Sequence, residues 1–456
     1  MLDKLAMTHD RIGFGFSPAD NKTKYAKTLK IFACCSFFLM LIAQLILIFT
    51  FKGKQISDAD VYLRWAKECS ENGWWYPAKS HIYSDYFFGN GLINLTALVL
   101  TVTKSLKVMF FINILFVQTI LWSCLYIIKK VFNRDSLCYW FVILFCWLNT
   151  FWSEAVQLRT ETMFTAFAFL GIAVLFSDKK WAYPVSGILL ALANWVRPVA
   201  LAFLIGAICV LIYKSKKIRH AIAVVAGYAV VILLIGIISF ISCGHFVYQS
   251  TTFGFNLIMS ANDDADGSYM VVVNEGQVGY IEPEVRKTMT FKDLDEYYTK
   301  LSLEWIKDNP LGYLKQIPAK MFFLYGTETY SGSVYFNNEK NTAGMDYIKS
   351  VANKFTGNSD EAIHIGDVLI VFNQLWYMMI AVMFAIGTVL FIKKKQWRCM
   401  VPLWISMLGG TGITILVVGS ARYHFPYLPV MIISAAFAFE CIFASVKTKK
   451  LQKGSL

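Results

Sequence analysis

The sequence predicts an all-α protein that crosses a membrane many times. Of its 456 residues, 57% are hydrophobic and only 16% are charged, whereas roughly 25% of the residues of a soluble domain are charged. The hydrophobic residues gather into runs that approach the roughly 20 residues a helix needs to cross a bilayer. Composition and run length together exclude a soluble globular enzyme, a disordered chain and a coiled coil.

About ten apolar runs are candidate transmembrane helices by their length. They cover residues 31–51, 108–128, 136–153, 161–177, 182–196, 198–213, 220–242, 367–392, 399–418 and 424–443. The first run is not expected to be a cleaved signal peptide, because it lies well inside the chain and no small-residue cleavage site follows it.

The lysine and arginine clusters predict the orientation of these helices. They lie near residues 22–30, 129–134, 179–180, 214–219, 393–398 and 447–450. All of them fall on one side, the cytoplasm by the positive-inside rule, if the short run 91–103 does not cross the membrane. We therefore predict an interfacial or re-entrant helix at 91–103 and cytoplasmic termini. The net charge of +13 is then a topology signal and does not indicate nucleic-acid binding.

This topology divides the chain into five parts. They are a cytoplasmic tail (1–30), an N-terminal transmembrane module (31–242) with a first outside loop (52–107), a non-cytoplasmic loop domain (243–366), C-terminal transmembrane helices (367–446) and a second cytoplasmic tail (447–456).

The loop domain is predicted to mix α and β structure. Residues 268–273 resemble a short strand. Thr290 is a suitable N-cap for a helix that Asn309-Pro310 ends. Residues 311–325 carry lysines among apolar residues, which is typical of an interfacial amphipathic helix.

Ionisable residues near the outer ends of the spans mark a candidate site. Asp58 and Asp60 follow the first span, Glu161 begins the fourth, and Arg197 and Arg422 lie in two later turns. In the predicted topology all five face the same compartment. Such residues are costly near a bilayer and usually functional. Arginine suits phosphate, and a carboxylate can accept a proton from an attacking hydroxyl.

Each of these residues also has a plainer interpretation. An Asp-x-Asp pair is common in loops. Arg197 and Arg422 could anchor the chain at the lipid headgroups. Glu161 suits the positive end of a helix dipole. For Glu154, which lies in the same short loop as Glu161, we favour a solvated helix cap over a role in catalysis.

No competing catalytic motif occurs in the chain. It contains no GxxxxGK[ST], HExxH, paired CxxC or GxSxG pattern. Without a nucleotide-binding motif, a soluble nucleotide-sugar donor at the cytoplasmic face is not expected.

Five short motifs follow one another along the chain: an acidic pair followed by Tyr62 (57–66), Thr160-Glu161 at the start of a span, Arg197-Pro198 after a helix rich in small residues, the outside segment 254–269, and an Arg-Tyr-x-x-Pro-x-x-Pro pattern (422–429). In their order and sidedness they resemble the GT-C superfamily of polytopic glycosyltransferases. The branch with protein O-mannosyltransferases and lipid A aminoarabinose transferases is the most similar.

The resemblance implies a sugar donor linked to polyprenyl phosphate. It also implies inverting transfer to a hydroxyl of a lipid, glycan or protein on the non-cytoplasmic face. The compact outside segment favours a bacterial protein, and hence the cytoplasmic membrane. Asp58 would take the acceptor's proton, Arg197 and Arg422 would hold the leaving phosphate, and Asp60 and Glu161 would orient the substrates.

The remaining site assignments complete this picture. We assign Lys79 to the donor phosphate, and Tyr62, His81 and Asn262 to the acceptor or the sugar. Many members of the superfamily have adjacent acids in the first motif, whereas Ala59 separates them here. This leaves open which of Asp58 and Asp60 is the base, and whether the two hold a divalent metal ion. No other cofactor is required, and the membrane lipids are further partners.

Two other function classes remain open. A transporter or flippase of lipid-linked sugars would also have many spans, although such proteins commonly have two related halves and helices broken near the midplane. A surface-polysaccharide polymerase or ligase would also carry a large outside loop with arginines, but it would not be expected to begin that loop with the acidic motif.

Overall fold

The computed structural model describes residues 24–453, except 84–85, 178, 215–216, 330 and 336–344. Within this part every regular element is a helix. The all-α class is therefore confirmed. Two cytoplasmic tails were predicted, at 1–30 and 447–456, and residues 1–23 and 454–456 of them lie outside the described residues. The remaining tail residues belong to α2 (Lys24–Thr50) and α21 (Leu428–Lys453).

Six apolar helices of the described part are long enough to cross a membrane. They are α2, α5 (Leu106–Phe132), α11 (Ile218–Cys243), α19 (Ile365–Lys393), α20 (Trp397–Val417) and the run Ala421–Ser445, which joins η4 (Ala421–Tyr427) to α21. A seventh span results if α6 (Asp135–Trp147) and the segment Thr150–Val156 are counted together across a 65° bend. The chain is thus a multi-pass membrane protein.

The prediction of about ten spans counted three helices that are shorter than a bilayer. These are α8 (Thr160–Val174), α9 (Ala182–Val196) and α10 (Ala200–Lys214), each of 15 residues. At 1.5 Å per residue they measure about 22 Å, while the hydrocarbon core is roughly 30 Å thick. Most of α8 is buried among other helices. Its apolar residues therefore form the protein core, which hydropathy alone does not distinguish from a lipid-facing surface.

Small residues let the bundle helices approach closely. A Cβ on Gly187 of α9 would lie 1.9 Å from the Val224 carbonyl oxygen of α11, and one on Gly387 of α19 would lie equally close to the Ser434 carbonyl of α21. Close backbone approach at small residues is a usual mode of helix packing in membranes. At the far end of the bundle, Tyr25 of α2 stacks on Phe443 of α21 with ring centroids 6.3 Å apart.

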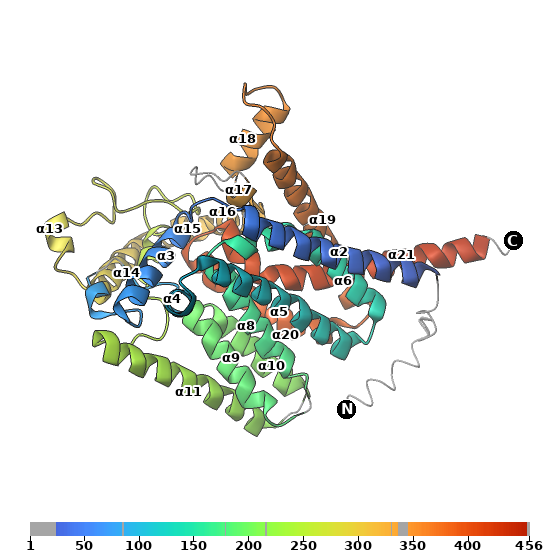
Figure 1. Ribbon diagram of the computed structural model, residues 1–456, viewed down its shortest axis with the longest axis horizontal. Helices are drawn as coiled ribbons and strands as arrows, with labels where there is room; N and C mark the ends of the chain where they lie inside the picture. Colours follow the sequence, from blue (N-terminus) through green and yellow to red (C-terminus); the bar gives the residue numbers. More distant parts are fainter. Residues whose placement is uncertain are drawn as a thin grey trace.

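The first outside loop folds into α3 (Asp58–Asn72), η2 (Lys79–His81) and α4 (Asn90–Thr103). The last of these confirms the short helix predicted at 91–103, and most of its residues are buried. In Figure 1, α3 lies at the left with α13 and α14 of the loop domain, whereas α2 and α21 extend to the right.

The loop domain is helical where it is described. It contains α12 (Phe253–Ile258), α13 (Pro283–Arg286), α14 (Phe291–Asp308), α15 (Pro310–Lys315), α16 (Ile317–Tyr325), α17 (Gly332–Tyr335) and α18 (Met345–Phe355). The predicted start of α14 is confirmed, because Thr290 accepts a hydrogen bond from the Asp293 amide and Asn309 follows the last turn. The helix predicted at 311–325 is present in two pieces, α15 and α16.

The predicted strand at 268–273 is absent from this structure. Only an isolated bridge joins Ser268 to Gly419. A strand needs a partner along its length, and here the facing chain turns away into η4 after Gly419. The mixed α/β character expected for the loop domain is therefore wrong for its described residues.

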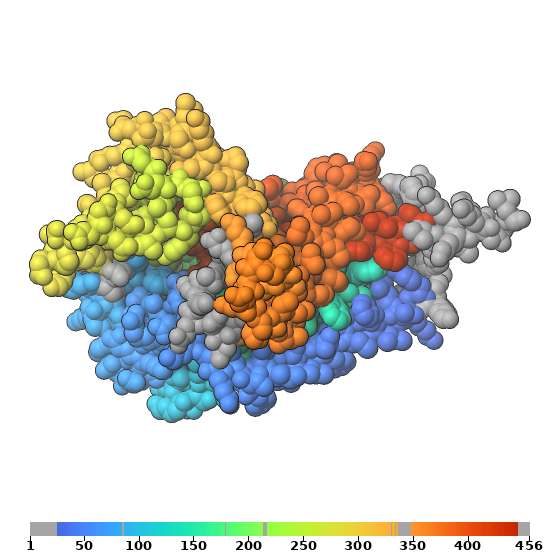
Figure 2. All heavy atoms as spheres, turned by 90° about the horizontal axis from the view of Figure 1, so that it is seen from above, coloured from blue at the N-terminus to red at the C-terminus, as the bar shows by residue number. Residues whose placement is uncertain are grey.

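The loop domain packs on the first outside loop. The Phe291 amide donates to the Ile82 carbonyl at 3.0 Å and the Thr251 amide to the Phe87 carbonyl at 2.7 Å. The rings of Phe87 and Phe291 lie 4.3 Å apart. Figure 2 shows these two regions, blue and yellow, side by side at one end of the molecule.

Candidate functional site

Two acids and two arginines from four separate segments meet at this end of the bundle. Arg422 of η4 donates from Nη1 to Asp58 Oδ2 at 2.5 Å and from Nε to Glu161 Oε1 at 2.8 Å. Arg197, which follows α9, donates from Nη1 to the same Glu161 oxygen. Asp58 and Arg422 are 364 residues apart in the sequence. Four of the residues predicted to share a site thus lie in contact, and we call them the arginine–carboxylate cluster.

The cluster is buried on one side and open on the other. The Glu161 side chain is fully buried, while Arg197 is 21%, Arg422 26% and Asp58 38% exposed. The two negative and two positive formal charges cancel. Arg197 uses only Nη1 for its bonds to Glu161 and Thr160. A guanidinium has five N–H donors, so Nε and Nη2 of Arg197 have no partner among the described residues and could bind an anion.

Tyr423 lies beside both arginines. Its ring centroid is 4.9 Å from the Arg197 guanidinium carbon and 5.7 Å from that of Arg422. A ring face attracts a cation in this range. Sequence reasoning did not assign Tyr423 to the site, although its position next to Arg422 in the last motif was an available signal.

The chain before α3 is held in the position that Asp58 requires. Gln55 donates to the Val156 carbonyl and accepts from the Leu158 amide, both at 2.9 Å, which ties this stretch to the segment leading into α8. Ser57 then takes φ 55 and ψ −134, a conformation that costs a non-glycine residue about 1–3 kcal/mol and often occurs at functional sites. Asp58 follows as the first residue of α3 and faces Arg422.

Tyr62 lies one turn after Asp58 on the same face of α3. Its ring is buried against Phe88 and Gly89. Gly89 has φ 66, and a Cβ there would lie 2.5 Å from Tyr62 Cε1, so only glycine fits. Burial and then the nearby Asp58 carboxylate raise the pKa of Tyr62. The phenol therefore stays protonated and can act as a hydrogen-bond donor beside the cluster.

Asp60 does not join the cluster. Two residues along a helix correspond to a rotation of about 200°, so Asp60 points away from the side on which Asp58 meets Arg422. Its side chain is exposed and forms no ion pair within the described part of the chain. Asp58 and Asp60 thus point to different sides of α3. Across the same residues, no three His, Cys, Asp or Glu side chains group as metal ligands.

The structure does not bring Lys79 and His81 to the cluster. His81 Nε2 lies 3.4 Å from Glu68 Oε2, and the Ala78 amide donates to His81 Nδ1 at 3.0 Å. Glu68 is ten residues after Asp58, about 15 Å along α3. Lys79 is exposed on the same short turn. Burial lowers the pKa of His81, and Glu68 opposes that shift. The turn that carries Lys79 and His81 folds back along the C-terminal half of α3. The sequence alone does not indicate this fold-back.

Asn262 is occupied within its own turn. Its Nδ2 donates to the Ile258 carbonyl at 2.7 Å, and its Oδ1 accepts from the Asp264 amide at 3.0 Å. Asn262 forms no hydrogen bond to the cluster among the described residues. From the same outside segment, Tyr269 is 57% exposed, and partial burial and then the charge of Asp58 raise its pKa.

Glu154 is a buried partner of Arg159, so its interpretation as a solvated helix cap is wrong. It is 0% exposed, lies 3.3 Å from Arg159 Nη1 and accepts a hydrogen bond from Thr162. The 65° bend after α6 turns the segment that carries Glu154 into the bundle. This bend depends on packing and could not be located from the composition of the run.

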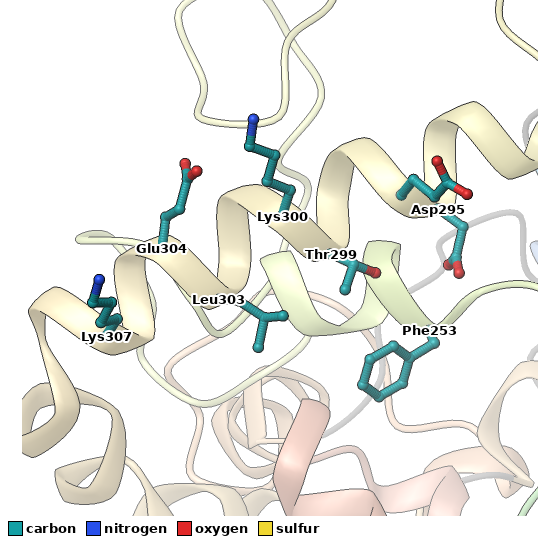
Figure 3. A pocket seen from close by; sticks show the side chains of 8 residues that line it. Phe253, Asp295, Thr299, Lys300, Leu303, Glu304 and Lys307 are labelled. Atoms are coloured by element: carbon teal, nitrogen blue, oxygen red, sulfur yellow. The ribbon is translucent and has the colours of Figure 1, made fainter.

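A groove on the loop domain lies apart from the cluster. It follows α14, with Phe253 of α12 on one side and Thr299 and Leu303 of α14 on the other, and measures about 580 Å³ (Figure 3). None of the four cluster residues lines it.

Comparison with known proteins adds no relative to this description. No protein-family model matches the chain, and neither a curated protein nor a solved structure matches it.

Proposed function

We propose that this protein is a membrane glycosyltransferase that moves a sugar from a polyprenyl-phosphate donor to a hydroxyl acceptor, with inversion at the anomeric carbon. One observation carries the proposal: Asp58, Glu161, Arg197 and Arg422 converge from four segments into one partly open cluster. The cluster combines a carboxylate that can take a proton with two guanidiniums that can hold a phosphate.

The arginines would bind the donor phosphate. Arg197 directs only Nη1 to the protein, and both guanidiniums are about a quarter exposed or less, so a phosphate oxygen can reach them from the open side. Glu161 is fully buried and accepts from both arginines through one oxygen. It reduces the repulsion between the two cations and fixes their spacing before the donor arrives, which favours electrostatic stabilisation of the developing charge.

Asp58 would act as the base. Its carboxylate pairs with Arg422 Nη1 at 2.5 Å, and at 38% exposure it remains accessible to an acceptor hydroxyl. The acceptor hydroxyl gives its proton to Asp58 while its oxygen bonds to the anomeric carbon. The bond from that carbon to the phosphate oxygen breaks, and its electron pair leaves with the polyprenyl phosphate. Arg197 and Arg422 hold the additional negative charge.

The proposal includes the side of the membrane and the class of acceptor. The site would lie on the non-cytoplasmic face of a bacterial cytoplasmic membrane; the lysine-rich helix ends support this side by the positive-inside rule. A lipid, glycan or protein hydroxyl on that face is the acceptor. The ionised groups lie at helix ends, whereas a flippase is expected to place them near the bilayer midplane. This difference favours transfer over transport.

Transfer of labelled sugar tests the proposal directly. The purified protein is placed in vesicles with radiolabelled polyprenyl-phosphate sugars and acceptor membranes. We expect Asp58→Asn to lower transfer by at least about 100-fold, the usual range for loss of a general base. Glu71→Gln changes an exposed carboxylate at the other end of α3 and is the matched control.

Two outcomes would change the proposal. Near-normal transfer by Asp58→Asn, together with loss of transfer by Asp60→Asn, would exchange the roles of the two aspartates. Movement of the labelled lipid across the vesicle without chemical change would identify a flippase.

A further inference from the structure

A second polar cluster lies beneath η4, fully inside the protein. Glu328 Oε2 and His424 Nε2 are 2.7 Å apart, and both side chains are 0% exposed. Glu328 lies in the loop after α16, and His424 lies in η4, two residues after Arg422. Fully buried ionisable residues in a membrane protein are rare and usually functional. None of the steps above uses this pair.

Two contacts orient the His424 ring. Its Nδ1 lies 2.6 Å from the Leu324 carbonyl oxygen, and a carbonyl only accepts, so Nδ1 carries a hydrogen. On the other side of the ring, Nε2 lies 2.7 Å from Glu328 Oε2, within ion-pair distance but not aligned as a hydrogen bond. The ring is therefore held between the Leu324 backbone and the Glu328 side chain.

Three further side chains hold Glu328 in place. Thr150 donates from its hydroxyl to Glu328 Oε1 at 2.9 Å. Asn373 of α19 donates to the Glu328 carbonyl at 2.9 Å and to the Thr150 hydroxyl at 3.0 Å. Gln374 accepts from the Glu328 amide at 2.8 Å. The Oε1 atom, the amide and the carbonyl of Glu328 are thus all hydrogen-bonded, and such buried hydrogen bonds favour one arrangement of the segment.

This network supports the segment that carries Arg422. η4 is a 3-10 helix, whose hydrogen-bond geometry is weaker than that of an α-helix. Its backbone therefore depends on side chains for a fixed position. His424 supplies one anchor through Glu328 and the Leu324 carbonyl. Its ring also stacks on Tyr377 of α19, with centroids 5.1 Å apart.

We propose that Glu328 and His424 are positioning residues for Arg422. The buried pair fixes η4 against α19 and α16, and thereby holds the Arg422 guanidinium ready for an anionic phosphate. This inference rests on the proposed function, since it assigns the pair to the phosphate-binding side of that same site. Neither residue touches the substrate.

Binding of polyprenyl monophosphate to the full-length protein in detergent tests the inference without knowledge of the sugar. We expect Glu328→Ala to raise the Kd about tenfold, as for loss of one charge-assisted hydrogen bond. In an Arg422→Ala background the same change should have no further effect, because residues that act through one group are not additive.

Two variants separate positioning from a general loss of stability. Glu328→Gln should restore most of the binding, because an amide can accept from Thr150 and donate to Nε2 of a neutral imidazole. Asp367→Ala is the matched control: Asp367 is also a fully buried acid of the bundle, but its ion-pair partner is Lys354. It should destabilise the fold while the Kd stays within about twofold.

Each remaining outcome has a definite meaning. The positioning role is overturned if Glu328→Ala leaves the Kd unchanged, or if it raises the Kd equally in the wild-type and Arg422→Ala backgrounds. Either result leaves the proposed function intact. Failure of the wild type to bind, or no effect of Arg422→Ala alone, overturns the proposed function and this inference with it. If Glu328→Ala does not fold, Thr150→Val removes only the hydroxyl that donates to Glu328, and an unchanged Kd for this variant overturns the role equally.

Discussion

The two polar clusters that η4 connects each pair an acid with a basic side chain, but they differ in exposure. The arginine–carboxylate cluster leaves Asp58 38% and Arg422 26% exposed, and Arg197 has donors that no described residue uses. The Glu328 and His424 side chains are both 0% exposed, and Thr150 and Asn373 donate hydrogen bonds to Oε1 and to the carbonyl of Glu328.

This difference separates binding from support. Arg197 has unused donors and the Arg422–Asp58 pair is partly exposed, so a ligand can bind both arginines while the buried Glu161 keeps its ion pairs. A sealed pair is strongly destabilised when one partner is removed, so it cannot exchange partners and serves to fix the chain. One short segment, η4, joins the two functions through Arg422 and His424.

The largest effect on stability is expected in the sealed cluster. Asn373→Ala removes the donors to the Glu328 carbonyl and the Thr150 hydroxyl. We expect it to lower the free energy of unfolding by about 2–4 kcal/mol, because buried polar groups lose their partners. Thermal unfolding in detergent, followed by tryptophan fluorescence, measures the change. A loss no larger than that of Arg197→Ala would remove the distinction between the clusters.

In the open cluster the expected effect is on the ligand. Arg197→Ala should raise the Kd for polyprenyl monophosphate about tenfold or more, the cost of one or two charged hydrogen bonds. Stability should fall by less than in Asn373→Ala, because the Arg197 side chain is 21% exposed and the buried Glu161 keeps its bond to Arg422. An unchanged Kd would make Arg197 a structural anchor only.

The smallest effect on stability is expected at Lys320. This residue sharpens the comparison because it is a buried base that forms no ion pair with an acid of the described residues. Its side chain is 0% exposed, and Nζ lies 4.2 Å from the Tyr313 ring centroid with no hydrogen-bond partner among the residues described. Burial lowers the pKa of Lys320 to about 8. We expect Lys320→Met to stabilise the fold at pH 7 by about 1 kcal/mol, since an apolar side chain replaces an uncompensated charge.

The pH dependence of this gain has a definite sign. The unfolded lysine titrates near 10.5 and the folded one near 8, so between these values the unfolded state holds more protons and wild-type stability rises with pH. The penalty of the buried charge is complete below pH 8 and fades toward pH 10.5. The advantage of Lys320→Met should therefore shrink between pH 7 and pH 10 in thermal unfolding. Equal gains at both values, or a similar trend in the exposed control Lys315→Met, would contradict the explanation.

Local patterns predicted the features that depend on neighbouring residues. The long apolar runs became α2, α5, α11, α19 and α20. Thr290 and Asn309 bound α14 because a cap and a proline act within one turn. The four members of the arginine–carboxylate cluster were also identified from the sequence, because they are charged residues at the ends of apolar runs. Burying an unpaired charge in a membrane is costly, so such residues are found mainly at helix ends.

Contacts between distant segments decided the rest. Glu154 is buried because the chain bends after α6, His81 turns toward Glu68 because its loop folds back along α3, and 268–273 lacks a partner strand. The pairing of Glu328 with His424 joins residues nearly a hundred positions apart. Whether an ionisable group is solvated or sealed depends on which segments pack against it. Sequence alone therefore indicated the charges that gather at one end of the bundle, and only the tertiary structure determined which of them stay open to a ligand and which are enclosed.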